Sequence, residues 1–195
     1  MSAALLIIDV QQALCSGEHA AFDSQRVIER INRVAAGARS AGAPVVLIQH
    51  EAPGTPFEFG TAGWQLAQGL DVRPTDIALR KTATDSFHLT RLQALLQERH
   101  VDQLIICGLQ SDFCVDTTTR RALALGYPVT LVSDGHSTVD NAILSAAQIS
   151  AHHTATLANI TSFGPRVTPL TAAACVARLA DSVRAGTIRP GEALP

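Results

Sequence analysis

Six short apolar runs recur along the chain, and no other feature constrains the fold as strongly. Each run is five to seven residues long and shows little alternation between apolar and polar side chains. Such runs are typical of strands buried on both faces of a sheet, because an exposed face would place a polar residue at every second position. The predicted strands cover residues 4–9, 44–50, 77–81, 103–108, 128–134 and 155–160.

Stretches with a helical spacing of apolar residues separate these runs. In the first of them, Val27, Ile31 and Val34 recur every three or four positions, which places them on one face of a helix. Alternating strands and helices predict an α/β fold, with three αβα layers around a six-stranded, mostly parallel, Rossmann-like sheet. The predicted helices cover residues 24–41, 89–98, 115–125, 140–151 and 168–185.

The length of the chain suits one domain. Its 195 residues, 47% of them apolar and 16% charged, can bury a full hydrophobic core. We expect a single domain over residues 1–195, with a core at about 4–185 and a loose tail at 186–195. One long irregular stretch, residues 51–74, is expected to be functional because long ordered loops in compact domains usually are.

Charge and hydropathy exclude several classes of partner. The net charge is −2, and no basic run is longer than two residues, so a nucleic-acid partner is not expected. No apolar run approaches the ~20 residues of a membrane span. The first twelve residues lack a charged segment and a cleavage-like site, so they are interpreted as a strand and not as a signal peptide, and a cytoplasmic location is the default.

Three polar residues lie at or just beyond the ends of predicted strands. Asp9 ends the first strand, Lys81 ends the third, and Cys114 follows the fourth at the start of a predicted helix. Carboxyl ends of parallel strands meet at one edge of a sheet, where ligands bind, so the three side chains could converge. Each also has an ordinary interpretation: an ion-paired or capping carboxylate, an exposed lysine and an inert buried thiol.

The combination favours chemistry at Cys114. A helix N-terminus and a nearby lysine both stabilise a thiolate. We therefore expect Cys114 to react with iodoacetamide well below pH 8, and faster than Cys15, Cys107 or Cys175. Asp9 could take the thiol proton and return it to a leaving group.

These motifs also resemble a known family. LLIIDVQ around Asp9, RKTATDSF around Lys81, and GLQSDFCVDTT with the following GYPVTLVSD are similar to the isochorismatase-like cysteine hydrolase superfamily, over residues 4 to about 160. The resemblance implies an isochorismatase-like fold, a six-stranded parallel sheet flanked by helices. It also implies a catalytic triad of Asp9, Lys81 and Cys114.

The resemblance further implies how such a site would work. The cysteine attacks a carbonyl, an amine or ammonia leaves, and water hydrolyses the thioester, so the expected activity is cleavage of a C–N bond in a small amide or ureide. A cis peptide bond is expected between Leu109 and Gln110. It would aim the backbone N–H of Gln110, beside that of Cys114, at the oxyanion. A homo-oligomer, a dimer or tetramer, is also implied.

The surroundings of the triad are less constrained by sequence. We expect the substrate pocket to draw on Gln11, His50, Phe57, Trp64 and Phe87. The metal-dependent nicotinamidases that this chain resembles carry an Asp-x-His pair after the second strand, and no such pair accompanies His50. The four cysteines also lack zinc-site spacing, so no metal and no cofactor are expected.

Two alternatives stay open at this point. Vinyl-ether hydrolysis of an isochorismate-type substrate does not need a nucleophilic cysteine. The presence of Cys114 therefore favours amide hydrolysis over this alternative, but only weakly. A non-enzymatic oligomeric or redox-sensing module would use Cys114 as an oxidisable thiol. That alternative gains weight if Asp9 and Lys81 do not both lie within hydrogen-bonding reach of Cys114.

Overall fold

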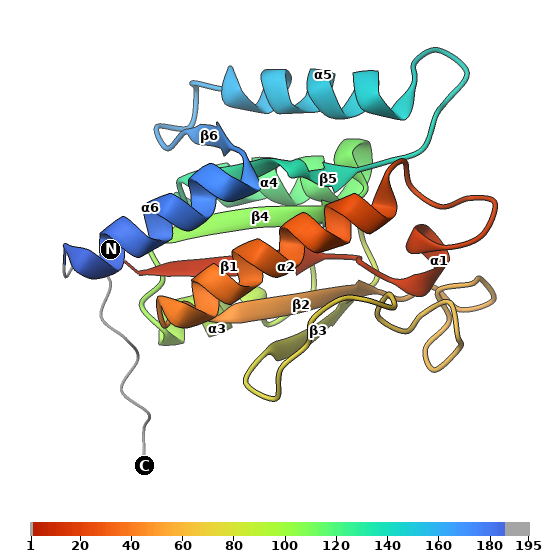
Figure 1. Cartoon of the computed structure of the whole chain (residues 1–195), viewed down its shortest axis with the longest axis horizontal. Helices are drawn as coiled ribbons and strands as arrows, with labels where there is room; N and C mark the ends of the chain where they lie inside the picture. The colour runs from red at the N-terminus through yellow and green to blue at the C-terminus, as the bar shows by residue number, and fades with distance from the viewer. Residues whose placement is uncertain (1, 186–195) are drawn as a thin grey trace.

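A six-stranded sheet with every neighbouring pair parallel forms the centre of the molecule (Figure 1). The structure is a computed structural model, and it describes residues 2–185. The strands follow the order β3-β2-β1-β4-β5-β6 across the sheet. They are β1 (Ala3–Ile8), β2 (Val45–His50), β3 (Ile77–Lys81), β4 (Gln103–Leu109), β5 (Val129–Ser137) and β6 (Val167–Leu170).

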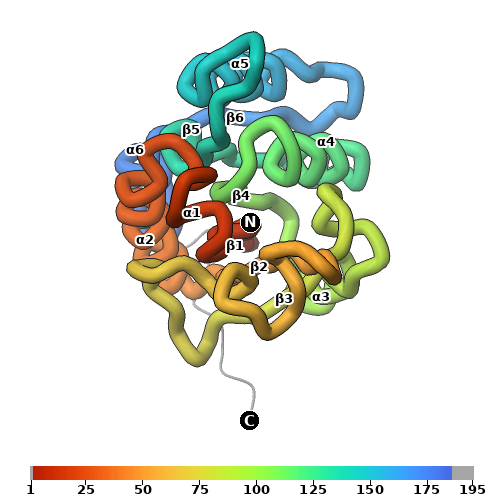
Figure 2. Tube along the Cα trace, turned by 90° about the vertical axis from the view of Figure 1, so that its right-hand side faces the viewer, coloured from red at the N-terminus to blue at the C-terminus, as the bar shows by residue number. Residues whose placement is uncertain are grey.

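Helices cover both faces of the sheet, which makes three layers (Figure 2). Side chains of α2 and α6 pack in one core cluster, and side chains of α3, α4 and α5 pack in the other. The helical elements are α1 (Gln12–Cys15), α2 (Ser24–Ser40), α3 (Leu92–Glu98), the π-helical turn η1 (Ser111–Val115), α4 (Asp116–Ala124), α5 (Ala146–Ala158) and α6 (Ala172–Arg184).

The unbroken apolar runs are explained by the packing of helices on both faces of the sheet. Every residue of β1 is buried, because β1 lies between β2 and β4 and has helices on both faces. The α/β fold with a six-stranded parallel sheet is therefore confirmed. No helix within residues 2–185 is long and apolar enough to cross a membrane. The expected tail at 186–195 lies outside the described residues.

The C-terminal third departs from the sequence prediction. Residues 155–160, predicted as the sixth strand, include the last turn of α5. That helix begins later than expected because Ser145 and Gln148 form a reciprocal capping box. The apolar side chains of this segment then serve a helix, and Leu157 is buried in the core.

The true sixth strand lies where a helix was expected to begin. Residues 167–170 form β6, a short edge strand that tolerates Pro169 because its outer side needs no ladder hydrogen bond. The helix begins only at Ala172, after Thr171, whose side-chain oxygen accepts a hydrogen bond from the N–H of Ala174.

Gly108 of β4 lies directly against Ile8, the last residue of β1. Its φ is +117°, and a Cβ atom there would lie 2.1 Å from the carbonyl oxygen of Ile8. We expect Gly108→Ala to lower the free energy of unfolding by about 3 kcal/mol or more, because both the conformation and the contact forbid a side chain. Urea denaturation followed by circular dichroism measures this loss.

Gly17→Ala is the matched control for that substitution. Gly17 also has a positive φ, +79°, but a Cβ atom there would meet nothing within 4 Å. The control should lose only the conformational part, about 1 kcal/mol. Equal losses in the two variants would show that the contact with Ile8 does not matter.

Candidate active site

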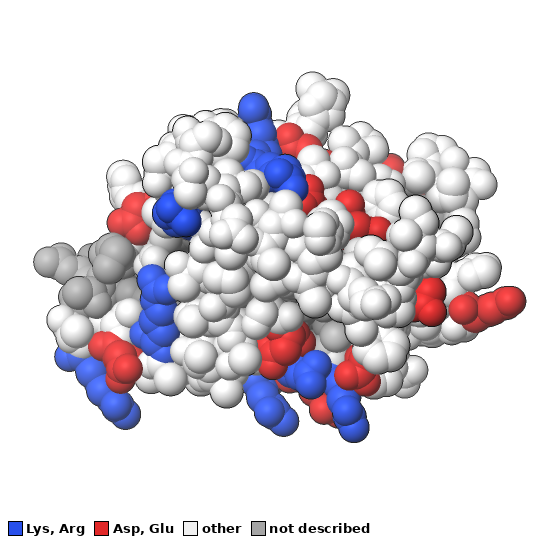
Figure 3. All heavy atoms as spheres, turned by 90° about the horizontal axis from the view of Figure 1, so that it is seen from above, with Lys and Arg blue, Asp and Glu red and all other residues white. Residues whose placement is uncertain are grey.

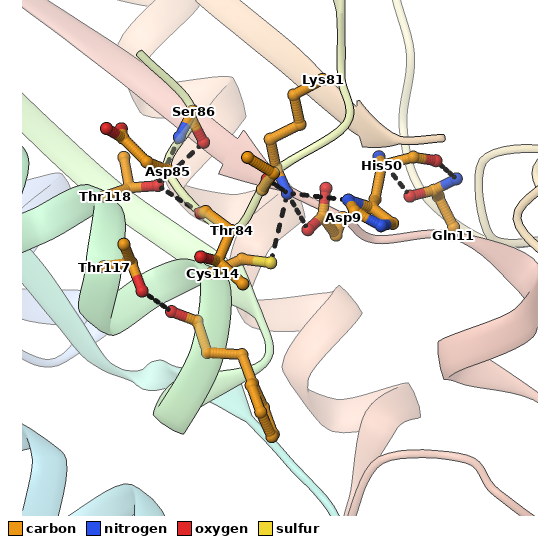
Figure 4. A network of polar contacts seen from close by, with 12 residues as sticks. Asp9, Gln11, His50, Lys81, Thr84, Asp85, Ser86, Cys114, Thr117 and Thr118 are labelled. Atoms are coloured by element: carbon orange, nitrogen blue, oxygen red, sulfur yellow. Dashed lines mark hydrogen bonds and ion pairs between the residues drawn. The ribbon is translucent and has the colours of Figure 1, made fainter. Parts of the chain in front are cut away.

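The polar strand ends meet at the carboxyl edge of the sheet (Figure 4). Asp9 follows β1, Lys81 is the last residue of β3, and Cys114 lies in η1 after β4. The ammonium nitrogen of Lys81 is 2.7 Å from Oδ2 of Asp9 and 3.2 Å from Sγ of Cys114. The structure therefore brings together the three residues that the sequence singled out, with Lys81 between the other two.

Lys81 is held in place by a full set of acceptors. Its side chain is 0% exposed, and its third hydrogen bond goes to the carbonyl oxygen of Ala83 at 3.0 Å. A lysine ammonium has three N–H donors, and here Asp9, Cys114 and Ala83 use all of them. These three acceptors hold the ammonium nitrogen of Lys81 beside the Cys114 thiol.

Asp9 leaves β1 with a left-handed backbone conformation, and within residues 2–185 only one of its carboxylate oxygens is hydrogen-bonded. Its φ is +50°, and its N–H donates to the carbonyl of Ile48 at 2.8 Å. Oδ2 binds Lys81, whereas Oδ1 is buried and has no hydrogen-bond partner among the described residues. An unsatisfied buried carboxylate oxygen is a ready proton acceptor.

The Cys114 thiol is neutral at rest, which corrects the expectation of a low-pKa thiolate. Burial, and after it the negative charge of Asp9, raise the pKa of Cys114 to about 12, against the lowering effect of Lys81. The sequence indicated the lysine and the helix start but not the burial, and burial is the largest effect. Proton transfer must therefore accompany any nucleophilic attack.

The rate of alkylation of Cys114 tests this protonation state. We expect the iodoacetamide reaction of the wild-type protein to rise continuously from pH 7 to pH 10, because the thiolate fraction grows throughout that range. Asp9→Asn removes a charge that raises the pKa of Cys114 and leaves the lowering charge of Lys81. The variant should therefore alkylate faster than wild type at pH 8. Peptide mass spectrometry separates Cys114 from the other cysteines.

The same digest supplies the control for that experiment. Burial also raises the pKa of Cys15 to about 12, and no carboxylate contributes to that shift. Its alkylation rate should be the same in Asp9→Asn and in wild type. A wild-type rate for Cys114 that levels off below pH 8 would contradict a raised pKa.

The turn that carries Cys114 is wound around Gln110. The peptide bond between Leu109 and Gln110 is cis, and the carbonyl of Gln110 accepts the N–H groups of Phe113 and Val115, both at 3.1 Å. The helical run therefore begins at Ser111, four residues earlier than predicted. Of Asp9, Lys81, Gln110 and Cys114, only Gln110 lies on the wall of a cavity of about 660 Å³.

Two residues expected in the pocket are structural instead. Gln11 is 0% exposed. Its side-chain amide donates to the carbonyls of His50 and Trp64 and accepts the N–H of His50 at 2.7 Å, so it clamps the 51–74 loop to β2. Phe87 packs in the core and stacks on Tyr127 with ring centroids 6.3 Å apart. Neither side chain has a free face for a substrate.

The other three expected pocket residues occupy different positions. His50 lies beside the triad, with Nδ1 3.5 Å from the Lys81 nitrogen, and its ring meets the edge of Phe57. Burial, and then the charge of Lys81, lower the pKa of His50, so its imidazole is neutral. Phe57 lines the 660 Å³ cavity together with Gln110. Trp64 lines a second hollow, beside β3, whose lining residues include Lys81.

The cavity is formed largely by residues that the sequence analysis did not select. They come from α1, the loop between α1 and α2, and the segment after β5. The sequence indicated only that polar loops follow the strand ends, and this pattern does not identify individual lining residues. The lining residues are Ala13, Leu14, Glu18, His19, Ala20, Phe22, Pro56, Phe57, Gln110, Val139 and Asp140.

No metal-binding arrangement is found in the described part of the chain. Within residues 2–185, no three His, Cys, Asp or Glu side chains are placed to hold one ion. His50 faces the Lys81 ammonium, and a neighbouring cation opposes metal binding. The residues around the triad therefore do not fit a metal cofactor.

Comparison with known proteins identifies the family that this chain resembles over most of its length. The Isochorismatase domain model matches residues 3–172. A streptothricin hydrolase from Streptomyces noursei is 43% identical over 138 residues, 70% of this chain and 50% of that protein. A ureidoacrylate amidohydrolase from Methylobacterium radiotolerans is 29% identical over an alignment of 196 positions, which covers 82% of this chain and 73% of that protein.

A solved structure agrees with these sequence matches. The crystal structure of an isochorismatase family protein is 40% identical, with a TM-score of 0.79, and the match covers 87% of this chain and 98% of that chain. The chain spans about half the length of the streptothricin hydrolases that it matches.

Proposed function

The chain belongs to the isochorismatase family, and on that premise we propose that it is a cysteine hydrolase that cleaves a C–N bond in a small amide or ureide. The observation that carries the proposal is the contact of one buried ammonium, Lys81, with both Asp9 and Cys114, at 2.7 and 3.2 Å. The proposal assigns base, nucleophile and orienting cation to these three residues.

The first half-reaction forms a thioester. The Cys114 proton passes to Asp9 as the sulfur attacks the carbonyl carbon and a C–S bond forms. Lys81 stabilises the negative charge on sulfur during the transfer. The C–N bond then breaks, and the departing nitrogen takes the proton from Asp9, so that amine or ammonia leaves and Cys114 carries the acyl group.

The second half-reaction returns the enzyme to its resting state. Asp9 takes a proton from water as the water oxygen attacks the thioester carbonyl. The C–S bond breaks, a carboxylic acid is released, and Cys114 regains its proton from Asp9. In both halves we assign the backbone N–H groups of Gln110 and Cys114 to the oxyanion, where each such donor is typically worth about 3 kcal/mol.

The charge of the cavity favours amides over isochorismate. Glu18 and Asp140 line the cavity, and no Lys or Arg is among its lining residues. On the face that Figure 3 draws, acidic side chains and no basic ones are seen at the end of the molecule where Figure 1 places α1. Isochorismate is a dicarboxylate and would be repelled there, whereas a neutral or cationic amide would not.

The thiol chemistry favours hydrolysis over redox sensing. A peroxide sensor needs an accessible thiolate, but Cys114 is 8% exposed and burial raises its pKa to about 12. In the proposed mechanism the thiol loses its proton to Asp9 only as it attacks a substrate carbonyl, so it needs no accessible thiolate at rest. The names of the amidohydrolase and streptothricin hydrolase relatives support the same choice.

A substrate panel tests the proposed function. Neutral amides, cationic amino-acid amides, carbamoyl compounds and isochorismate are incubated with the protein, and ammonia, amine and pyruvate are measured. We expect ammonia or amine from at least one amide or carbamoyl compound, with the cationic amides preferred over anionic analogues. Pyruvate from isochorismate, with every amide inert, would overturn the proposal. A homo-oligomer and a cytoplasmic location remain predictions.

A further inference from the structure

A buried hydrogen-bond network lies behind the turn that carries Cys114, and the mechanism above does not use it. Nδ1 of His136 on β5 is 2.7 Å from the hydroxyl of Ser111, the first residue of η1. The Ser111 hydroxyl is also 2.9 Å from that of Ser150, and Nε2 of His136 is 3.0 Å from that of Thr154. Ser150 and Thr154 belong to α5, which lies over β5 (Figure 1).

The proton positions in this network follow from one bond. The Thr154 hydroxyl donates to the carbonyl of Ser150 at 2.8 Å, and a hydroxyl has only one proton. Thr154 must therefore accept from Nε2–H of His136. Neutral His136 then has a bare Nδ1, which accepts the hydroxyl proton of Ser111, and Ser111 accepts that of Ser150. Every donor in the network has an acceptor only in this arrangement.

The network ties the catalytic turn to the sheet. His136 pairs with Gly108 across the β4–β5 ladder, where the register shifts, and Ser111 immediately follows Gln110. Ser111 and His136 are both nearly fully buried. The hydrogen bond between them thus fixes the point at which the chain leaves β4 and turns to present Gln110 and Cys114.

We propose that His136 is a positioning residue: through Ser111, its neutral imidazole holds the η1 turn so that Cys114 and the N–H of Gln110 face the substrate carbonyl. The proposal rests on the proposed function. The charged and titratable groups facing His136 are Asp134 on β5 and His153 on α5, the latter paired with Asp116 of α4. Burial, and then His153, lower the pKa of His136 to about 4 against Asp134, which keeps the imidazole neutral.

Two amide substitutions separate the two ends of the imidazole. His136→Asn places an amide oxygen where Nδ1 lies and can still accept from Ser111. His136→Gln reaches toward Thr154 and cannot. We expect kcat for the best amide of the panel to fall about tenfold or more in His136→Gln with KM within about twofold, and to fall far less in His136→Asn, because misplacing a nucleophile affects the chemical step.

Ser111→Ala supplies a second line of evidence. It should lower kcat as much as His136→Gln, and the double variant should lose no more than either single one, since both remove the same hydrogen bond. Leu157→Ala, a core change on α5 that removes none of the network's hydrogen bonds, controls for lost stability and should keep kcat within about twofold. Equal losses of kcat in His136→Asn and His136→Gln would overturn the proposal.

Amide hydrogen exchange gives a readout that needs no substrate. Exchange of the peptide covering residues 109–115 should accelerate about tenfold or more in His136→Gln and stay close to wild type in His136→Asn and Leu157→Ala. Unchanged exchange in His136→Gln would also count against the positioning role. If no amide is turned over, the proposed function fails, and the exchange experiment still decides whether His136 holds the turn.

Discussion

Replacing Lys81 with Met is expected to lower the free energy of unfolding by about 3–5 kcal/mol and to abolish turnover. The substitution keeps the length of the side chain but leaves the Asp9 carboxylate, 1% exposed, without its cation. One oxygen of that carboxylate already has no hydrogen-bond partner among the described residues, so the other would join it. Urea denaturation measures the stability, and the substrate panel measures the turnover.

Two further variants make this prediction specific. Asp9→Asn combined with Lys81→Met removes both charges, and it should recover most of the lost stability without any activity, because no buried charge remains unpaired. Arg80→Met changes the neighbouring cation on the outer side of β3, whose side chain is 53% exposed. That control should cost no more than about 1 kcal/mol. A Lys81→Met protein as stable as Arg80→Met would show that the buried pair contributes little.

Replacing Cys114 with Ala is expected to reduce turnover of any amide found by the panel by at least about a thousandfold. The nucleophile disappears, and neither Asp9 nor Lys81 can form the covalent intermediate. Stability should change little, because the substitution removes a sulfur atom from the edge of the core and leaves no unpaired charge. Circular dichroism verifies the fold, and ammonia release measures the activity.

Cys15→Ala is the matched control for the nucleophile. Cys15 is also buried, with a pKa raised to about 12 by burial, but it lies in the core cluster on the side of α2. Its replacement should leave turnover close to that of wild type. Activity of Cys114→Ala above a tenth of the wild-type value would sink the covalent mechanism and favour direct attack by water.

Most of the fold could be predicted from the sequence, because strands that are buried on both faces consist of continuous apolar residues. β1, β2, β4 and β5 each contain a continuous apolar run, and each lies within a few residues of its predicted bounds. β6 was missed because a four-residue edge strand needs few apolar residues and contains Pro169. Hydrophobic pattern also could not separate the last turn of α5 from a strand, since a short apolar segment suits either.

The meeting of Asp9, Lys81 and Cys114 followed from topology, but their electrostatics did not. Ends of parallel strands share an edge, so position along the chain sufficed to bring these residues together. Burial of the Cys114 thiol depends on side chains from several elements packing around it, which no local pattern records. Local pattern also did not reveal the packing of two expected pocket residues. Gln11 is hydrogen-bonded to backbone groups, and Phe87 packs in the core, so neither faces a substrate.

Because the Lys81 side chain is fully buried, its chemical modification can measure how often the active site opens to solvent. Within the 195 residues it is the only lysine, and its side chain is 0% exposed. Amine-directed reagents therefore meet one internal target, and only when the centre of the site opens to solvent. The rate at which Lys81 acquires an acetyl group would then time the opening of the active site, with no engineered label.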